Sequence, residues 1–263
     1  MRQKLEMYAA GLKALVMGAN LRSLTEIANP FLFTYYASEN LFIYKSLFNK
    51  GLPAKRISDV FGDGNGNIQD ITLAFPSDGG WGFGAIGSFT ADIVNLCLLV
   101  KTLKPANIFE IGTFHGYGAL HLALNAPQAN VFTLDLPKGV MPALDRTSVD
   151  DVHIKLADRG RPPLLANYEA GQRVACLKGD SAPFDYCPYH GKVDLFFIDG
   201  AHSYAYVRND TMKALECCHP GSVIAWHDYG RAGVNGVSKW LHEFAQDRNV
   251  YRVPGGSLAY SIV

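Results

Sequence analysis

Five acidic residues each end, or lie close to the end of, a short apolar segment of this chain. They are Glu110, Asp135, Asp180, Asp199 and Asp228. Two histidines accompany the last two acids, because His202 lies three residues after Asp199 and His227 directly precedes Asp228. Carboxylates can hold ribose hydroxyls or a hard cation, and an imidazole can accept a proton near neutral pH. These residues are the candidates for binding a nucleoside, holding a metal and moving a proton.

The apolar segments that carry these acids predict the strands of one sheet. Residues 193–198 form a nearly continuous apolar run, as a strand buried on both faces does. Shorter runs at 108–111, 131–134, 174–178 and 222–226 alternate with helical patterns at 92–103, 119–124, 203–218 and 234–245. Residues 250–253 and 258–263, joined by a Pro-Gly-Gly turn, predict a hairpin. The alternation predicts an α/β fold, with a doubly wound Rossmann-like seven-stranded sheet that ends in a C-terminal antiparallel hairpin.

The position of the acids in this sheet predicts where a ligand binds. Parallel strands are joined by right-handed connections, so their carboxyl ends open on the same edge of the sheet. Ligands of such folds bind at that edge. Residues 138–172 are longer and more polar than a helical crossover needs, which predicts a loop-plus-helix insertion near the same edge.

A glycine-spaced turn after the first of these strands predicts a nucleoside site. The sequence from Glu110 to Gly118 places Gly112 and Gly116 between strand and helix, and Asp135 ends the next strand. This order suits a nicotinamide dinucleotide or S-adenosyl-L-methionine (SAM). The turn lies about 110 residues into the chain, no Tyr-x-x-x-Lys pair occurs, and Glu110 precedes the first glycine by two residues. These features favour SAM and leave an NAD-dependent oxidoreductase as a minor alternative.

A set of motifs in fixed order carries a family resemblance. The segments are 110–118, 133–137, 179–182, 197–204 and 224–229. Together they resemble a class I SAM-dependent methyltransferase, most closely the bacterial metal-dependent sugar and macrolide O-methyltransferases and more distantly catechol O-methyltransferase. The resemblance covers about residues 88–263. Residues 1–87 are predicted to form a separate N-terminal helical and loop cap.

The resemblance implies a cofactor-binding role for eight residues. Gly112, Thr113 and Gly116 would hold the methionine part of SAM, with Glu110 beside them. Asp135 would bind the ribose hydroxyls, and Asp199 would border the cofactor. Asp180 and Ser181 would border the adenine, although Asp180 is almost as well explained as a capping residue of a strand-to-helix turn.

The resemblance also implies a metal site and a catalytic base. Asp199, His227 and Asp228 would ligate a divalent metal, Mg or Mn, and the histidine favours manganese or iron over magnesium. Asp199 and His202 would be catalytic, with His202 as the general base that accepts the acceptor's hydroxyl proton. The alternative for His202 is a helix N-terminal residue bonded to the preceding loop.

The function predicted from these residues is metal-assisted O-methylation of a hydroxyl on a small molecule or sugar. The alternatives are a metal-independent methyltransferase, in which His227 and Asp228 hydrogen-bond the acceptor, and a non-catalytic SAM-binding protein. Equal numbers of basic and acidic residues argue against a nucleic-acid partner. Five cysteines without zinc spacing and the lack of a long apolar run predict a cytoplasmic chain without a membrane span. The apolar helices predicted in 3–50 are compatible with a homodimer.

Overall fold

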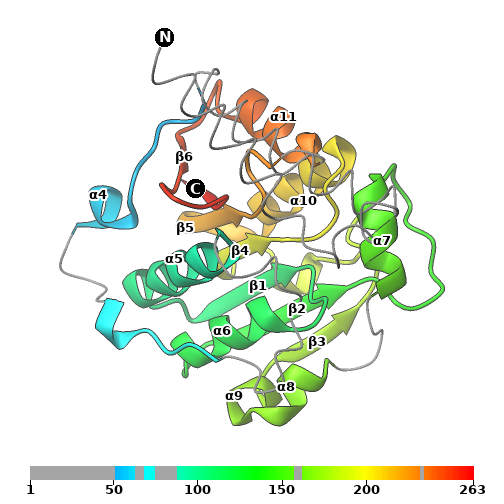
Figure 1. Cartoon of the computed structure of the whole chain (residues 1–263), viewed down its shortest axis with the longest axis horizontal. Coiled ribbons are helices and arrows are strands. Elements are labelled where there is room, and N and C mark those ends of the chain that lie inside the picture. The colour runs from blue at the N-terminus through cyan, green and yellow to red at the C-terminus, as the bar shows by residue number, and fades with distance from the viewer. Residues whose placement is uncertain (1–50, 63–67, 75–87, 157–161, 232–233) are drawn as a thin grey trace, which may run out of the picture. The chain divides into compact units, whose positions relative to one another are not determined.

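The computed structural model of the chain describes residues 51–62, 68–74, 88–156, 162–231 and 234–263 (Figure 1). The chain divides into two compact units, one of residues 1–50 with 230–233 and one of residues 51–229 with 234–263. The second unit contains the sheet. The helices predicted in 3–50 lie outside the described residues. In the described part of the chain, no helix has the length and apolar character that a membrane span requires.

The second unit is built on a seven-stranded sheet in the order β3-β2-β1-β4-β5-β7-β6. The strands are β1 (Asn107–Ile111), β2 (Asn130–Asp135), β3 (Ala175–Lys178), β4 (Val193–Ile198), β5 (Cys218–Trp226), β6 (Val250–Arg252) and β7 (Ala259–Ile262). The first five strands are parallel, and β7 pairs antiparallel with both β5 and β6. The predicted fold class, strand number and C-terminal hairpin are confirmed.

The described helices are α4 (Ile57–Phe61), α5 (Ser88–Leu103), α6 (Tyr117–Asn125), α7 (Ser148–Leu156), α8 (Pro163–Asn167), α9 (Glu169–Gln172), α10 (Tyr204–Cys217) and α11 (Asn235–Phe244), with short 3-10 turns at Ile68–Asp70 and Cys187–Tyr189. Four of them, α5, α6, α10 and α11, lie where the sequence periodicity predicts a helix. Ser203 caps α10, because its side chain accepts a hydrogen bond of 3.2 Å from the Tyr206 N–H. The insertion at 138–172 contains α7, α8 and α9.

Strand β5 begins four residues earlier than the sequence predicts. Pro220-Gly221 is a turn signal, yet both residues lie within the strand. The register explains this, because Val193 pairs with Cys218 whereas Leu195 pairs with Val223, so two residues on β4 face five on β5. The extra residues bulge out of the ladder, and Gly221 adopts a φ of 91° there.

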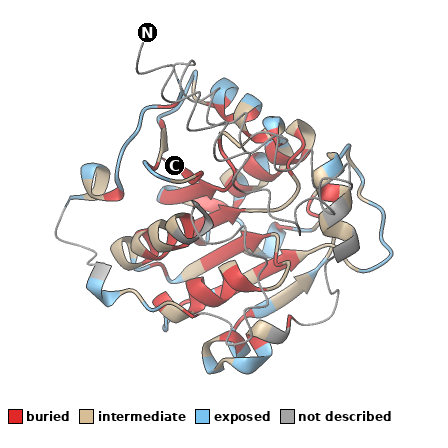
Figure 2. Cartoon of the chain, viewed as in Figure 1, coloured by how far each residue is buried: buried red, intermediate tan, exposed pale blue. Residues whose placement is uncertain are grey.

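Successive side chains of each central strand point to opposite faces of the sheet, and helices cover both faces. The central strands are almost wholly apolar for this reason. Ile108 and Val131 pack with α5 and α6 on one face of the sheet. Phe109, Ile111 and their neighbours pack with α10 and α11 on the other face. Figure 2 shows the resulting continuous burial of the central strands. Each fully buried side chain of this size contributes about 1.5–3 kcal/mol, so the rigid centre of the sheet is a firm base for the residues at its edge.

Residues 51–62 and 68–74 fall in the same compact unit as the sheet, although the sequence analysis placed them in the N-terminal cap. The Thr72 N–H donates to Asn125 Oδ1 at 2.9 Å, and the Ala74 N–H donates to His121 Nε2 at 3.1 Å. Both acceptors lie on α6. The buried His121 is therefore a structural residue, and burial lowers its pKa.

Candidate active site

The carboxyl ends of β1, β2, β4 and β5 lie side by side and bring the predicted site residues together. Ile111 pairs with Leu134 and with Ile198, and Ile198 pairs with Trp226. The next residue along each strand is Gly112, Asp135, Asp199 or His227. The expectation that the acids gather on one edge of the sheet is met for these strands.

The turn after β1 is pressed against the start of the loop after β4. Gly112 has a φ of 100°, and a Cβ at this position would lie 2.0 Å from the carbonyl oxygen of Asp199. The Asp199 N–H donates to the Ile111 carbonyl at 2.9 Å. Gly116, with a φ of 85°, is the N-cap of α6. Only glycine allows this close approach, so the turn and Asp199 are positioned together.

Glu110 is buried beneath the turn and does not line the pocket. Its Oε2 accepts a hydrogen bond of 2.5 Å from Thr133 Oγ1, which lies 2.7 Å from Thr113 Oγ1. A Cβ on Gly118 would lie 2.2 Å from Glu110 Oε1, so the carboxyl group sits under the first turn of α6. Burial raises its pKa well above the usual value. In this structure the acid supports the turn, and direct contact with the cofactor stays a prediction.

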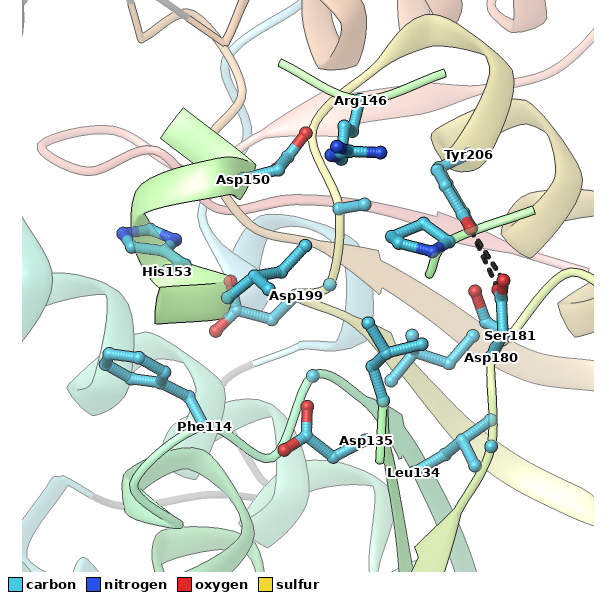
Figure 3. A pocket seen from close by; sticks show the side chains of 18 residues that line it. Phe114, Leu134, Asp135, Arg146, Asp150, His153, Asp180, Ser181, Asp199 and Tyr206 are labelled. Carbon is cyan, nitrogen blue, oxygen red and sulfur yellow. Dashed lines mark hydrogen bonds between the residues drawn. The ribbon is translucent and has the colours of Figure 1, made fainter. Parts of the chain in front are cut away.

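A pocket opens at this edge between the strand ends and α7 (Figure 3). Five of the predicted cofactor residues line it, namely Gly112, Asp135, Asp180, Ser181 and Asp199. Thr113 and Gly116 do not line it. The predicted set omitted several lining residues, among them Phe114, Arg146, Asp150, His153 and Tyr206. Three of those five, Arg146, Asp150 and His153, come from the 138–172 insertion. The insertion therefore lies at the ligand edge, as the sequence predicts.

The carboxylate of Asp180 is occupied by donors from three segments. Tyr206 Oη donates to both of its oxygens at 2.9 Å. The Ala143 N–H donates to Oδ2 at 2.6 Å, and the Ala182 N–H donates to Oδ1 at 3.0 Å. The bond from Ala182, two residues on, is the local turn that the capping alternative describes. Asp180 therefore fixes the pocket wall, and adenine contact stays a prediction.

Asp199, His227 and Asp228 form the cluster that was predicted to hold a metal. One ligand atom from each residue lies within 4.8 Å of the others. His227 Nδ1 is 3.0 Å from Asp199 Oδ1 and 3.2 Å from Asp228 Oδ1. Burial acts to lower the pKa of His227, but the two carboxylates outweigh it and raise the pKa well above 6.5. Asp228 has a φ of 61°, a left-handed conformation that aspartate tolerates and that often marks a functional site.

His202 is held between two carboxylates. Its Nδ1 lies 2.6 Å from Asp150 Oδ1, and its Nε2 lies 2.8 Å from Asp228 Oδ2. The His202 N–H also donates to Asp150 Oδ1 at 3.0 Å. Burial acts to lower the pKa of His202, but the two hydrogen bonds outweigh it and raise the pKa to about 10. The imidazole therefore links Asp228, a member of the Asp199, His227 and Asp228 cluster, to Asp150 on α7.

Asp150 combines two tasks that the sequence analysis did not assign. Thr147 and Asp150 form a capping box at the start of α7, in which the Thr147 N–H donates to Asp150 Oδ2 at 2.6 Å and the Asp150 N–H donates to Thr147 Oγ1 at 3.2 Å. The other oxygen of Asp150 binds His202. The Thr-x-x-Asp pattern indicates the cap, but it does not indicate which residue the second oxygen meets.

Comparisons with known proteins agree with this arrangement. Residues 109–229 match the family model described as "Methyltransferase domain". The calicheamicin methyltransferase CalS11 is 17% identical, with 66% of this chain and 79% of its own covered and a TM-score of 0.53. The Bacillus cereus O-methyltransferase in complex with S-adenosylhomocysteine (SAH) is 22% identical, with 66% and 81% covered and a TM-score of 0.46. TomG of Streptomyces achromogenes, in complex with SAM, is 18% identical, with 87% and 98% covered and a TM-score of 0.46. No curated protein matches the sequence.

The sheet order and the ligand edge define a Rossmann-like methyltransferase fold, a likeness of fold that CalS11 shares. The family match spans β1 through β5, including the glycine turn and the cluster at 227–228. Residues 109–229 therefore match a methyltransferase domain, the class that the sequence motifs predict. This match supports the predicted methyltransferase class over the nicotinamide oxidoreductase, and SAM as the cofactor stays a prediction.

Proposed function

We propose that this methyltransferase moves the methyl group of SAM to a hydroxyl oxygen of a small-molecule or sugar acceptor, assisted by a divalent cation. The observation that carries the proposal is the grouping of Asp199, His227 and Asp228 beside the glycine turn, with Asp199 lining the pocket. A hydroxyl is a weak nucleophile at neutral pH, so its methylation needs groups that orient it and take its proton. This cluster supplies such groups.

The three side chains fit a cation. Two carboxylates would repel each other at this spacing, and His227 now lies between them with hydrogen-bond distances to both. A cation can replace the proton on His227 Nδ1 and balance the same two charges. The mixed oxygen and nitrogen set suits Mn²⁺ better than Mg²⁺. When bound, the cation supplies a Lewis acid that lowers the pKa of the acceptor hydroxyl.

His202 is the residue we assign as general base. Its Nε2 faces the cluster and lies 2.8 Å from Asp228 Oδ2. That nitrogen now carries a proton and donates it in a hydrogen bond to Asp228, so His202 accepts the acceptor's proton only after its own Nε2 proton has passed to the Asp228 carboxylate. Asp150 holds the opposite nitrogen and keeps the ring orientation fixed during this exchange. Positioning of the two reactants supplies much of the remaining acceleration, because the sulfonium methyl is already reactive.

The metal-independent alternative rests on the same contacts. His227 and Asp228 already form an ion pair, with 3.2 Å between Nδ1 and Oδ1. Such a pair can hydrogen-bond an acceptor hydroxyl without a cation. The two mechanisms differ in one property, since only the cation-assisted reaction stops when divalent metals are removed.

The experiment is a methyl-transfer assay with labelled SAM against glycan, phenol and macrolide pools. We expect the label on an acceptor oxygen, loss of turnover after EDTA dialysis, and recovery with Mn²⁺. Turnover that persists fully after EDTA dialysis would leave the metal-independent reaction. Label on nitrogen or carbon would contradict O-methylation itself.

Two variants test the roles of single residues. Asp199→Ala and His202→Ala should abolish turnover and leave SAM binding by calorimetry nearly intact. Asp247→Ala and His190→Ala, which change the same residue types at exposed positions, are the matched controls. Loss of SAM binding in both site variants would contradict the division between cofactor and acceptor residues.

A further inference from the structure

Asp92, in the second turn of α5, is a buried acid to which neither the sequence motifs nor the proposed mechanism gives a task. It is 2% exposed. Its Oδ1 accepts the Ser257 N–H at 2.7 Å and the Leu258 N–H at 3.0 Å, and its Oδ2 accepts Ser257 Oγ at 2.7 Å. A Cβ on Gly256 would lie 1.9 Å from Oδ1. The loop between β6 and β7 therefore wraps around this carboxylate and fixes the orientation of both oxygens.

The same carboxylate reaches the metal cluster through His227. Asp92 Oδ2 lies 3.2 Å from His227 Nε2, across 135 residues of sequence. The opposite nitrogen, Nδ1, is the one that faces Asp199 Oδ1 and Asp228 Oδ1. The ring thus has one nitrogen on Asp92 and the other in the cluster. His227 is 7% exposed, so the carboxylates on either side, rather than solvent, determine how the ring is held.

We propose that Asp92 is the positioning residue of the cation site: it holds the Nε2–H of His227 so that Nδ1 is presented to the cation between Asp199 and Asp228. This inference rests on the cation-assisted function proposed above. A metal-bound histidine commonly donates its other ring N–H to a carboxylate, which fixes the tautomer and the ring orientation. Here the carboxylate comes from α5, outside the segment that carries the ligands.

The geometry makes one substitution diagnostic. In Asp92→Asn, the two backbone donors at Ser257 and Leu258 still require an oxygen, so the amide nitrogen takes the place of Oδ2. That NH₂ group donates to His227 Nε2 and makes this nitrogen an acceptor. The neutral ring must then carry its proton on Nδ1, where it blocks ligation. The variant keeps the shape of the side chain and reverses the direction of the two hydrogen bonds made at the Oδ2 position, those with His227 Nε2 and Ser257 Oγ.

The experiment is calorimetric titration of MnCl₂ into the full chain of wild type, Asp92→Asn and Ser257→Ala, with SAH titrations alongside. Asp92→Asn should bind Mn²⁺ about 10–100-fold more weakly, the usual effect of losing such a partner. Its SAH affinity should stay within about twofold of wild type, since Asp92 does not line the pocket. Ser257→Ala removes one donor to Asp92 but leaves the contact with His227, so its Mn²⁺ affinity should be unchanged.

A second readout needs no metal. Proton NMR of the metal-free protein should show a protected downfield Nε2–H resonance of His227 in wild type and in Ser257→Ala, shifted or lost in Asp92→Asn. Equal Mn²⁺ affinity of wild type and Asp92→Asn would overturn this inference and leave the proposed function standing. Wild type that methylates but binds no Mn²⁺ would overturn both. Should Asp92→Asn not fold, absence of the protected proton in wild type overturns the assignment.

Discussion

Gly112→Ala is the substitution whose effect follows most directly from the site. The new Cβ would lie 2.0 Å from the Asp199 carbonyl oxygen, whereas ordinary contact begins at 3.4 Å. The difference, 3.4 − 2.0 = 1.4 Å, must come from separating two backbone segments, because no flexible side chain is involved. That separation strains the hydrogen bond from the Asp199 N–H to Ile111. One change therefore displaces both the turn that we propose to hold the cofactor and the acid that we propose to face the acceptor.

A matched control separates the loss of stability caused by the close contact from the loss caused by the strained backbone angle. Gly139 also has a positive φ, of 78°, but a Cβ there meets nothing within 4 Å. Gly139→Ala should lose only the left-handed strain, about 1–2 kcal/mol. Gly112→Ala adds overpacking of about 1–3 kcal/mol and a weakened buried hydrogen bond of about 1–3 kcal/mol. We expect an excess over the control of about 2–6 kcal/mol, or at least about 4 °C in Tm.

The assay is calorimetric unfolding of wild type and the two variants, followed by SAH titration at a temperature where all are folded. Gly139→Ala should bind SAH like wild type, and Gly112→Ala should bind it much more weakly. If the two variants unfold at the same temperature and bind SAH equally well, the close packing of the turn against Asp199 is refuted.

Three further predictions concern the pocket wall and its supports. Thr147→Ala removes the capping box that holds Asp150 and should lower stability by about 1 kcal/mol, measured by urea unfolding. Tyr206→Phe removes the donor shared by both oxygens of Asp180 and should lower stability by about 1–3 kcal/mol in the same assay. Burial raises the pKa of Asp210 from 3.8 to about 7. The unfolded chain ionises first, so this group lowers stability as pH rises from about 4 to 7, by at most about 4 kcal/mol. Urea unfolding at pH 5 and pH 8 should show a smaller loss for Asp210→Asn than for wild type.

The sequence predicted the sheet and its ligand edge because both depend on local patterns. Apolar runs of strand length and helical periods between them leave few arrangements for a parallel sheet, and right-handed connections then place the strand ends together. Asp135 and Asp199 could be assigned to the pocket for this reason. The helix Tyr204–Cys217 could be placed from its Ser203 cap.

The contacts that fix the site could not be predicted, because they join residues far apart in the chain. Asp150 meets His202 across 52 residues, and Asp92 meets His227 across 135. Neither acid follows an apolar strand, so neither belongs to the pattern that revealed the others. Glu110 follows that pattern, yet its side chain points to the face of the sheet that α6 covers. It is buried under α6 and does not line the pocket. Whether a side chain at a strand end faces the pocket or the core depends on how the strand is packed and not on the residue type.

We propose that one edge of the sheet binds SAM and presents an acceptor hydroxyl at Asp199, His227 and Asp228. The most direct measurement is labelled-methyl transfer to a hydroxyl acceptor by wild type and Asp228→Ala, with SAH affinity determined for both by calorimetry. We expect a methylated oxygen with wild type, and no turnover but nearly unchanged SAH affinity with the variant. Full turnover by Asp228→Ala, or no SAH binding by wild type, would contradict it.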